Sequence, residues 1–240
     1  MGLSDIITEP VPCRTMVLFF VIDTSGSMEG EKIAEVNNAI QSVIPEVQKI
    51  SEDSADANIK VAVLDFSSGV EWRTLEPVDV KTFQWDFLQA GGVTDLGTAC
   101  QELAAKLSRK AFMKDATGSF APVIILLSDG EPTDDYKRGL DVLRQNNWYK
   151  CAIKIALAIG NDANQEVLAE FTGNKELVLT AHNPTQLRKM IRCVTVTSST
   201  IGSQSSSVAD PNQPIDNSQN FINNPEIQEL INAPEEEDEW

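Results

Sequence analysis

Apolar residues gather in four short runs, separated by longer stretches in which apolar and polar residues alternate at helical spacing. The runs are Met16–Ile22, Ile59–Phe66, Val123–Leu127 and Ala152–Ile159. Near-continuous runs of branched apolar residues are typical of strands that are buried on both faces of a parallel sheet. Weaker strands are predicted at Val70–Thr74, antiparallel at an edge of the sheet, and at Glu176–Leu179.

Between the strands the pattern predicts helices. From Glu31 to Ile50 apolar residues recur every three or four positions, and we expect a kink or break before Pro45 because proline donates no helix hydrogen bond. Further helices are predicted at Leu96–Ala111, Asp135–Gln145, Asn164–Phe171 and Thr185–Cys193. This alternation predicts a doubly wound α/β fold, with a mostly parallel central sheet of about six strands and helices on both faces. Such folds bind ligands beyond the carboxyl ends of their strands.

The composition changes near the end of the α/β pattern. We expect an N-terminal extension at 1–13, one domain at 14–194, and a Ser-rich flexible linker with an acidic tail at 195–240. Within the tail, Asn224 and Pro225 favour the start of a short helix at 224–231. Its apolar side chains, together with a preceding phenylalanine, are predicted to dock onto a partner: Phe221, Ile227, Leu230 and Ile231.

The charge of the chain excludes several partners. The formal net charge is −17, and residues 201–240 carry nine acids and no base. Nucleic-acid phosphates and anionic lipid would be repelled, so we expect neither nucleic acid nor a membrane as partner. The four cysteines form no CxxC motif. Asp5 and Glu9 make the N-terminus unlike a signal peptide. The apolar run Met16–Ile22 is far shorter than the ~20 residues that a membrane span needs. We therefore expect a cytoplasmic protein.

Candidate chemistry begins in the stretch "FFVIDTSGSM". Asp23 ends the first predicted strand, and Ser25 and Ser27 follow at alternate positions around a glycine. A tight loop of this kind can direct three oxygens toward one point. Asp and Ser ahead of a helix are also common turn formers and caps, so this loop alone leaves both interpretations open.

Two further stretches favour a metal site. "GGVTDLG" places Thr94 just before a helix, and "ILLSDGEPTD" places Asp129 at the carboxyl end of another predicted strand. Two carboxylates and three hydroxyls are hard oxygen donors, which suit Mg²⁺ or Mn²⁺ better than a dedicated calcium cage. A cation would also allow both carboxylates to stay ionised at close range.

These motifs together resemble the metal-ion-dependent adhesion site of a von Willebrand factor A domain. The likeness runs from about residue 14 to 194, and "DTSGSM", "LLSDGEPTDDY" and "AIGNDANQEVLAEFTGN" are most similar to the short bacterial TerY-like type of tellurium-resistance clusters. One departure is Val93, which separates the glycine pair from Thr94. The resemblance implies a non-catalytic module in which a partner protein supplies an Asp or Glu carboxylate to the metal. It also implies a stress-response setting with a protein kinase or phosphatase as partner.

Other function classes fit less well. An aspartic protease needs a second Asp-Thr/Ser-Gly motif and an all-β fold, and the sequence indicates neither. A Ser-His-Asp hydrolase would depend on His182, the single histidine, which stands in a predicted loop, and the sequence has no GxSxG motif. No phosphate-binding glycine loop is present. An accessory subunit of a AAA+ ATPase of the chelatase type stays open as an alternative, and a metal-dependent hydrolase is a more remote one.

Overall fold

The computed structural model of the chain describes residues 14–54, 57–114, 118–161, 163–204 and 218–232. A seven-stranded sheet has the order β3-β2-β1-β5-β6-β7, with β4 also pairing with β2. The strands are β1 (Arg14–Asp23), β2 (Ala57–Ser67), β3 (Gly69–Trp72), β4 (Val78–Asp79), β5 (Val123–Ser128), β6 (Ile153–Ile159) and β7 (Val178–Ala181). All pairs are parallel except those of β3 and β4 with β2. The predicted fold class, including the antiparallel edge strand, is confirmed.

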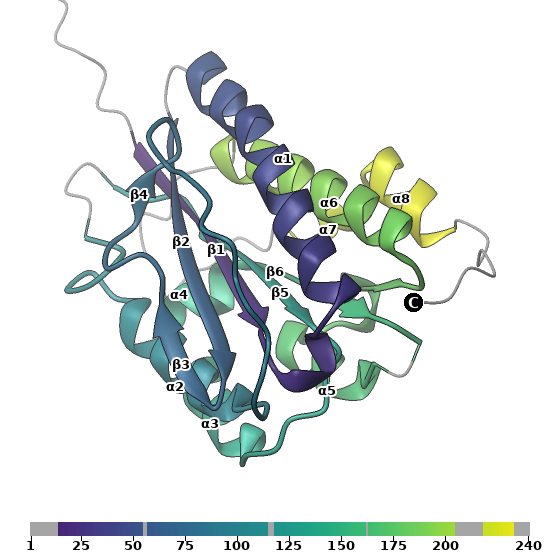
Figure 1. Cartoon of the computed structure of the whole chain (residues 1–240). Helices are drawn as coiled ribbons and strands as arrows, with labels where there is room; N and C mark the ends of the chain where they lie inside the picture. Colours follow the sequence, from purple (N-terminus) through teal and green to yellow (C-terminus); the bar gives the residue numbers. More distant parts are fainter. Residues whose placement is uncertain (1–13, 55–56, 115–117, 162, 205–217, 233–240) are drawn as a thin grey trace, which may run out of the picture.

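Helices cover both faces of this sheet (Figure 1). They are α1 (Glu31–Asp53), α2 (Leu96–Lys106), α3 (Tyr136–Gln145), α4 (Asn147–Cys151), α5 (Gln165–Thr172), α6 (Pro184–Gln204), α7 (Ser218–Ile222) and α8 (Pro225–Ile231), with 3₁₀ turns η1 (Gly26–Met28) and η2 (Lys175–Leu177). One core joins α1, α6, α7 and α8 to the sheet. The other core joins α2, α3, α4 and α5 to the sheet. Along β1, Phe20 faces the first core and Phe19 the second, which is why this strand is apolar throughout.

The expected interruption at Pro45 does not occur as a break, because α1 continues to Asp53. Ile40, Val43 and Val47 are fully buried on either side of the proline. Burial of this apolar stripe, at roughly 1.5–3 kcal/mol per side chain, offsets the ~3 kcal/mol that proline costs inside a helix.

The prediction of a flexible linker from residue 195 is wrong for residues 195–204, which extend α6 as far as Gln204. Ser198 and Ser199 are fully buried in this extension, and the Ser198 hydroxyl donates to the carbonyl of Val194 at 2.6 Å. A Cβ on Gly202 would lie 3.2 Å from Val123 Cγ2, so the helix packs closely on the sheet. The small side chains of this stretch allow the close approach, although the buried Ser199 hydroxyl has no hydrogen-bond partner among the described residues.

The short helix expected at 224–231 is confirmed as α8, and the Asn224 side chain accepts a hydrogen bond from the Glu226 N–H at 2.9 Å. Its predicted docking onto a partner needs correction. Phe221 and Ile227 are 0% exposed and lie in the core of this chain, because the sheet and α6 offer an apolar surface next to them. Leu230 is partly buried against the same core, and Ile231 is 42% exposed.

The predicted N-terminal extension at 1–13, the part of the predicted linker at 205–217 and the acidic tail from residue 233 lie outside the described residues. Among the helices that are described, none is long and apolar enough to cross a membrane.

Candidate metal centre

Asp23 is the last residue of β1 and is fully buried. Its Oδ1 accepts a hydrogen bond from the Ser25 N–H at 2.9 Å, and its Oδ2 accepts one from the Ser128 hydroxyl at 2.6 Å. Burial raises the pKa of the Asp23 carboxyl, because the ionised form loses its hydration; the two hydrogen bonds lower the pKa, and the charge of Asp129 raises it. The carboxylate is therefore fixed in orientation but costly to keep ionised.

The turn after Asp23 brings two serine hydroxyls together. Ser25 Oγ and Ser27 Oγ are 3.0 Å apart, and Ser25 is buried whereas Ser27 is exposed. This short contact places both hydroxyls on the same side of the loop. The predicted grouping of these two residues is thus present.

Thr94 stands on a second loop that is hydrogen-bonded to the first. The Gly91 N–H donates to the Thr24 carbonyl at 2.7 Å, and the Gly26 N–H donates to the Gly92 carbonyl at 3.0 Å. Gly92 has a φ of +90°, and a Cβ there would lie 2.5 Å from Ser68 Oγ, so only glycine fits. Val93 directs its side chain outward, at 47% exposed, and Thr94 is only 5% exposed.

Asp129 follows β5 on a third loop, which is tied to the second by the Thr133 N–H donating to the Thr94 carbonyl at 2.8 Å. The residue is 5% exposed. Its Oδ2 lies 3.3 Å from Lys32 Nζ, and its Oδ1 is buried without a hydrogen-bond partner. A buried carboxylate oxygen without a donor is costly, so this atom indicates a missing cation or donor.

The structure therefore places the five predicted residues on three mutually hydrogen-bonded loops at the carboxyl edge of the sheet: Asp23, Ser25, Ser27, Thr94 and Asp129. Over the described part of the chain, no group of three or more His, Cys, Asp or Glu side chains could hold a metal. Only two of the five are carboxylates, and hydroxyls supply the remaining oxygens. This donor set and the orphaned Asp129 Oδ1 fit a hard divalent cation such as Mg²⁺ or Mn²⁺.

Sequence reasoning missed three residues that support this arrangement. Ser128 orients Asp23, and Lys32 pairs with Asp129. Asp134 accepts hydrogen bonds from the Gly97 and Thr98 N–H groups, both at 2.9 Å, which joins the third loop to the start of α2. Ser128 and Asp134 belong to the quoted "SDGEPTDD" stretch and could have been singled out as possible turn and cap residues.

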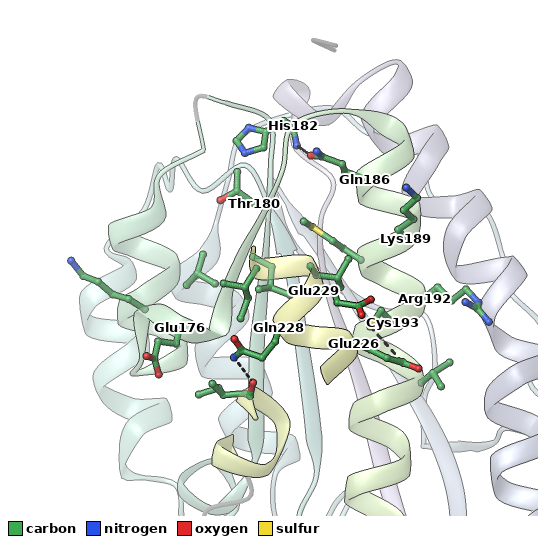
Figure 2. Close-up of a pocket in the computed structure, with 18 of the residues that line it drawn as sticks. Glu176, Thr180, His182, Gln186, Lys189, Arg192, Cys193, Glu226, Gln228 and Glu229 are labelled. Atoms are coloured by element: carbon green, nitrogen blue, oxygen red, sulfur yellow. Dashed lines mark hydrogen bonds between the residues drawn. The ribbon is translucent and has the colours of Figure 1, made fainter. Parts of the chain in front are cut away.

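A pocket of about 940 Å³ lies elsewhere, between β7, α6 and α8 (Figure 2). Leu230 and Ile231 line it, but the five candidate ligands do not. His182 stands at its rim, and its ring contacts the side-chain oxygen of Asn161. Among the described residues, no carboxylate pairs with His182 as a Ser-His-Asp site would require.

Comparisons with known proteins agree with this architecture. Inter-alpha-trypsin inhibitor heavy chain H1 of Mesocricetus auratus is 32% identical over 124 residues, which cover 49% of this chain and 13% of that protein. A von Willebrand factor type A structure from Catenulispora acidiphila is 19% identical with a TM-score of 0.57, covering 78% of this chain and 43% of the other. Proximal thread matrix protein 1 of the mussel byssus, in a structure with a zinc-occupied MIDAS motif, is 16% identical with a TM-score of 0.57, covering 79% of this chain and 49% of the other.

The chain thus spans about an eighth of its curated relative and under half of these two solved chains. The profile described as von Willebrand factor type A domain matches residues 18–192, which include every strand end and loop that forms the candidate metal centre. With the profile, the sheet order and the three loops in agreement, the chain belongs to the von Willebrand factor type A domain family.

Proposed function

We propose that this chain is a non-catalytic, divalent-metal-dependent protein-binding module. Asp23, Ser25, Ser27, Thr94 and Asp129 would hold Mg²⁺ or Mn²⁺, as in a metal-ion-dependent adhesion site. When bound, the ion supplies a Lewis-acidic position that an Asp or Glu carboxylate of a partner protein can occupy. Membership of a family of protein-interaction and metal-binding domains supports this proposal.

The observation that carries the proposal is the state of Asp129. Its carboxylate is almost fully buried, and one of its oxygens has no hydrogen-bond partner. Beside it, burial already raises the pKa of Asp23, so two acids share a poorly hydrated edge of the sheet. A divalent cation satisfies the free oxygen and offsets the repulsion between the acids.

The chain's own residues would orient and shield the site. Ser128 and the Ser25 N–H fix Asp23, and the glycines at 26 and 92 allow the first two loops to approach closely. Ser27 is exposed, which leaves the centre accessible from solvent on that side. A buried set of ligands with one accessible side suits binding of an external carboxylate.

Titration with MgCl₂ and MnCl₂ by isothermal calorimetry tests the metal site. The parent should bind one ion, Asp129→Asn should lose measurable binding, and Asp141→Asn should match the parent, because Asp141 is an exposed carboxylate on α3 with 71% side-chain exposure. Equal binding by the parent and Asp129→Asn would remove the proposal. Carboxylate recognition is tested by co-purification in Mg²⁺ or in EDTA, with Asp129→Asn as the negative control.

The finer setting rests on the motifs that resemble TerY-like domains. On that basis we propose a cytoplasmic, bacterial stress-response role with a protein kinase or phosphatase as partner. Genes next to the one encoding this chain, and the Mg²⁺-dependent partners recovered above, test this assignment independently of the metal.

A further inference from the structure

A cation supplied by the chain itself lies at the candidate metal centre. Lys32 is in the first turn of α1, and its Nζ is 3.3 Å from Asp129 Oδ2. The Lys32 side chain is 14% exposed and that of Asp129 is 6% exposed, so water screens this ion pair only weakly.

The two acids of the centre, Asp23 and Asp129, have different kinds of hydrogen-bond partners. Both oxygens of Asp23 accept hydrogen bonds from uncharged donors, Ser25 and Ser128. Asp129 instead has the Lys32 ammonium on one oxygen and no partner on the other. The ammonium is thus placed to neutralise Asp129 while leaving half of its carboxylate open.

We propose that Lys32 is an internal counter-cation of the site, which lowers its affinity for divalent ions. This inference rests on the proposed function, because it concerns the same five ligands. Lys32 holds the Asp129 carboxylate in position while the centre holds no divalent ion. Binding of such an ion then has to overcome both the lost Lys32–Asp129 attraction and the repulsion from a positive charge that stays on α1.

A purely structural role of the Lys32–Asp129 ion pair would give a different change in metal affinity. If Lys32 only joins α1 to the loop after β5, removing its charge should lower stability and leave the metal affinity unchanged or weaker. If Lys32 is a competing cation, removing its charge should lower the stability of the metal-free protein and raise the affinity for metal. A rise in metal affinity together with a fall in metal-free stability therefore identifies Lys32 as a competing cation. A fall in stability without a rise in affinity identifies a purely structural ion pair.

The test compares Lys32→Met with the parent, using Mn²⁺ as the probe and electron paramagnetic resonance to measure free Mn²⁺. Lys32→Met removes the charge but keeps an unbranched side chain, and Lys32→Arg keeps the charge. Lys49→Met is the matched control, since Lys49 is exposed on the same helix and carries the same charge away from the site. Melting in EDTA is recorded for each variant.

Lys32→Met should bind Mn²⁺ about tenfold more tightly than the parent, while Lys32→Arg and Lys49→Met stay within about twofold. The metal-free melting temperature of Lys32→Met should fall. If Lys32→Met does not fold, Lys32→Gln provides the same neutralisation with a polar end. Equal or weaker Mn²⁺ binding by the neutral variant overturns the role of Lys32 alone, whereas a parent that binds no Mn²⁺ overturns the proposed function as well.

Discussion

Replacing Asp23 with asparagine should separate the contribution of this carboxylate to metal binding from its cost to the fold. Asp23 is fully buried, and burial raises the pKa of its carboxyl despite hydrogen bonds from Ser128 and Ser25. With the folded pKa above the unfolded one, the folded chain binds more protons between the two values. The free energy of unfolding of the metal-free protein therefore falls as the pH rises through that window, and stays lower at neutral pH.

The expected size of the metal response follows from mass action. Mg²⁺ at ~100 times its dissociation constant should raise the free energy of unfolding of the parent by ~2.7 kcal/mol. For a domain of this size that corresponds to a rise in melting temperature of about 5–10 °C. Asp23→Asn should lose this rise, yet in EDTA at neutral pH it should melt at or above the parent, since the amide is not ionised.

Thermal unfolding followed by circular dichroism, in EDTA and in a MgCl₂ series, measures both effects. Asp141→Asn is the control, because it removes an exposed carboxylate and should keep the full Mg²⁺ response. A parent-like Mg²⁺ response in Asp23→Asn would refute the assignment of Asp23 as a ligand. A melting temperature several degrees below the parent in EDTA would refute the argument that its buried charge destabilises the fold.

Three other predictions concern packing, backbone and chemistry. Phe221→Ala should lower the free energy of unfolding by about 3–5 kcal/mol in urea titrations, because Phe221 is fully buried. Ile231→Ala, at an exposed site, should change it by less than about 1 kcal/mol. Similar losses in the two variants would contradict the docking of α7. Gly92→Ala should destabilise the fold and weaken Mg²⁺ binding, because its Cβ would meet Ser68 Oγ. Gly173→Ala, with a similar positive φ but nothing within 4 Å of the added Cβ, should cost stability only. Purified protein with Mg²⁺ should hydrolyse neither p-nitrophenyl phosphate nor casein, and activity that is present in the parent and lost in Asp23→Ala would contradict this.

Much of the fold could be predicted because each buried strand is a continuous apolar run. The stretch at 195–204 could not, since its serines and threonines have the composition of a linker. They can be helical because Gly202 lets the helix pack closely on Val123. The hydroxyls of Ser198 and Thr200 are accommodated there by donating to carbonyls four residues earlier. Likewise, the sequence identified Phe221, Ile227 and Leu230 as residues that become covered, but it did not identify Ile222, and periodicity does not reveal which surface covers them.

The candidate site, too, could be predicted only in part from the sequence. Its five residues lie at a strand end, in the loop that follows a strand, or just before a helix, so their position along the chain indicates a shared edge of the sheet. Lys32 gives no such signal, because its approach to Asp129 depends on how α1 leaves the first loop. Ser128 is the last residue of β5, and its contact with Asp23 depends on the neighbouring position of β1 and β5.

Crystals grown with MnCl₂ and measured near the manganese absorption edge would show whether the five residues hold a metal ion. We expect a single strong anomalous peak among the side-chain oxygens of Asp23, Ser25, Ser27, Thr94 and Asp129, and no such peak in Asp23→Asn crystals grown in the same way. A parent map without a peak at these five residues, or with its only strong peak elsewhere on the chain, would contradict the proposed metal site.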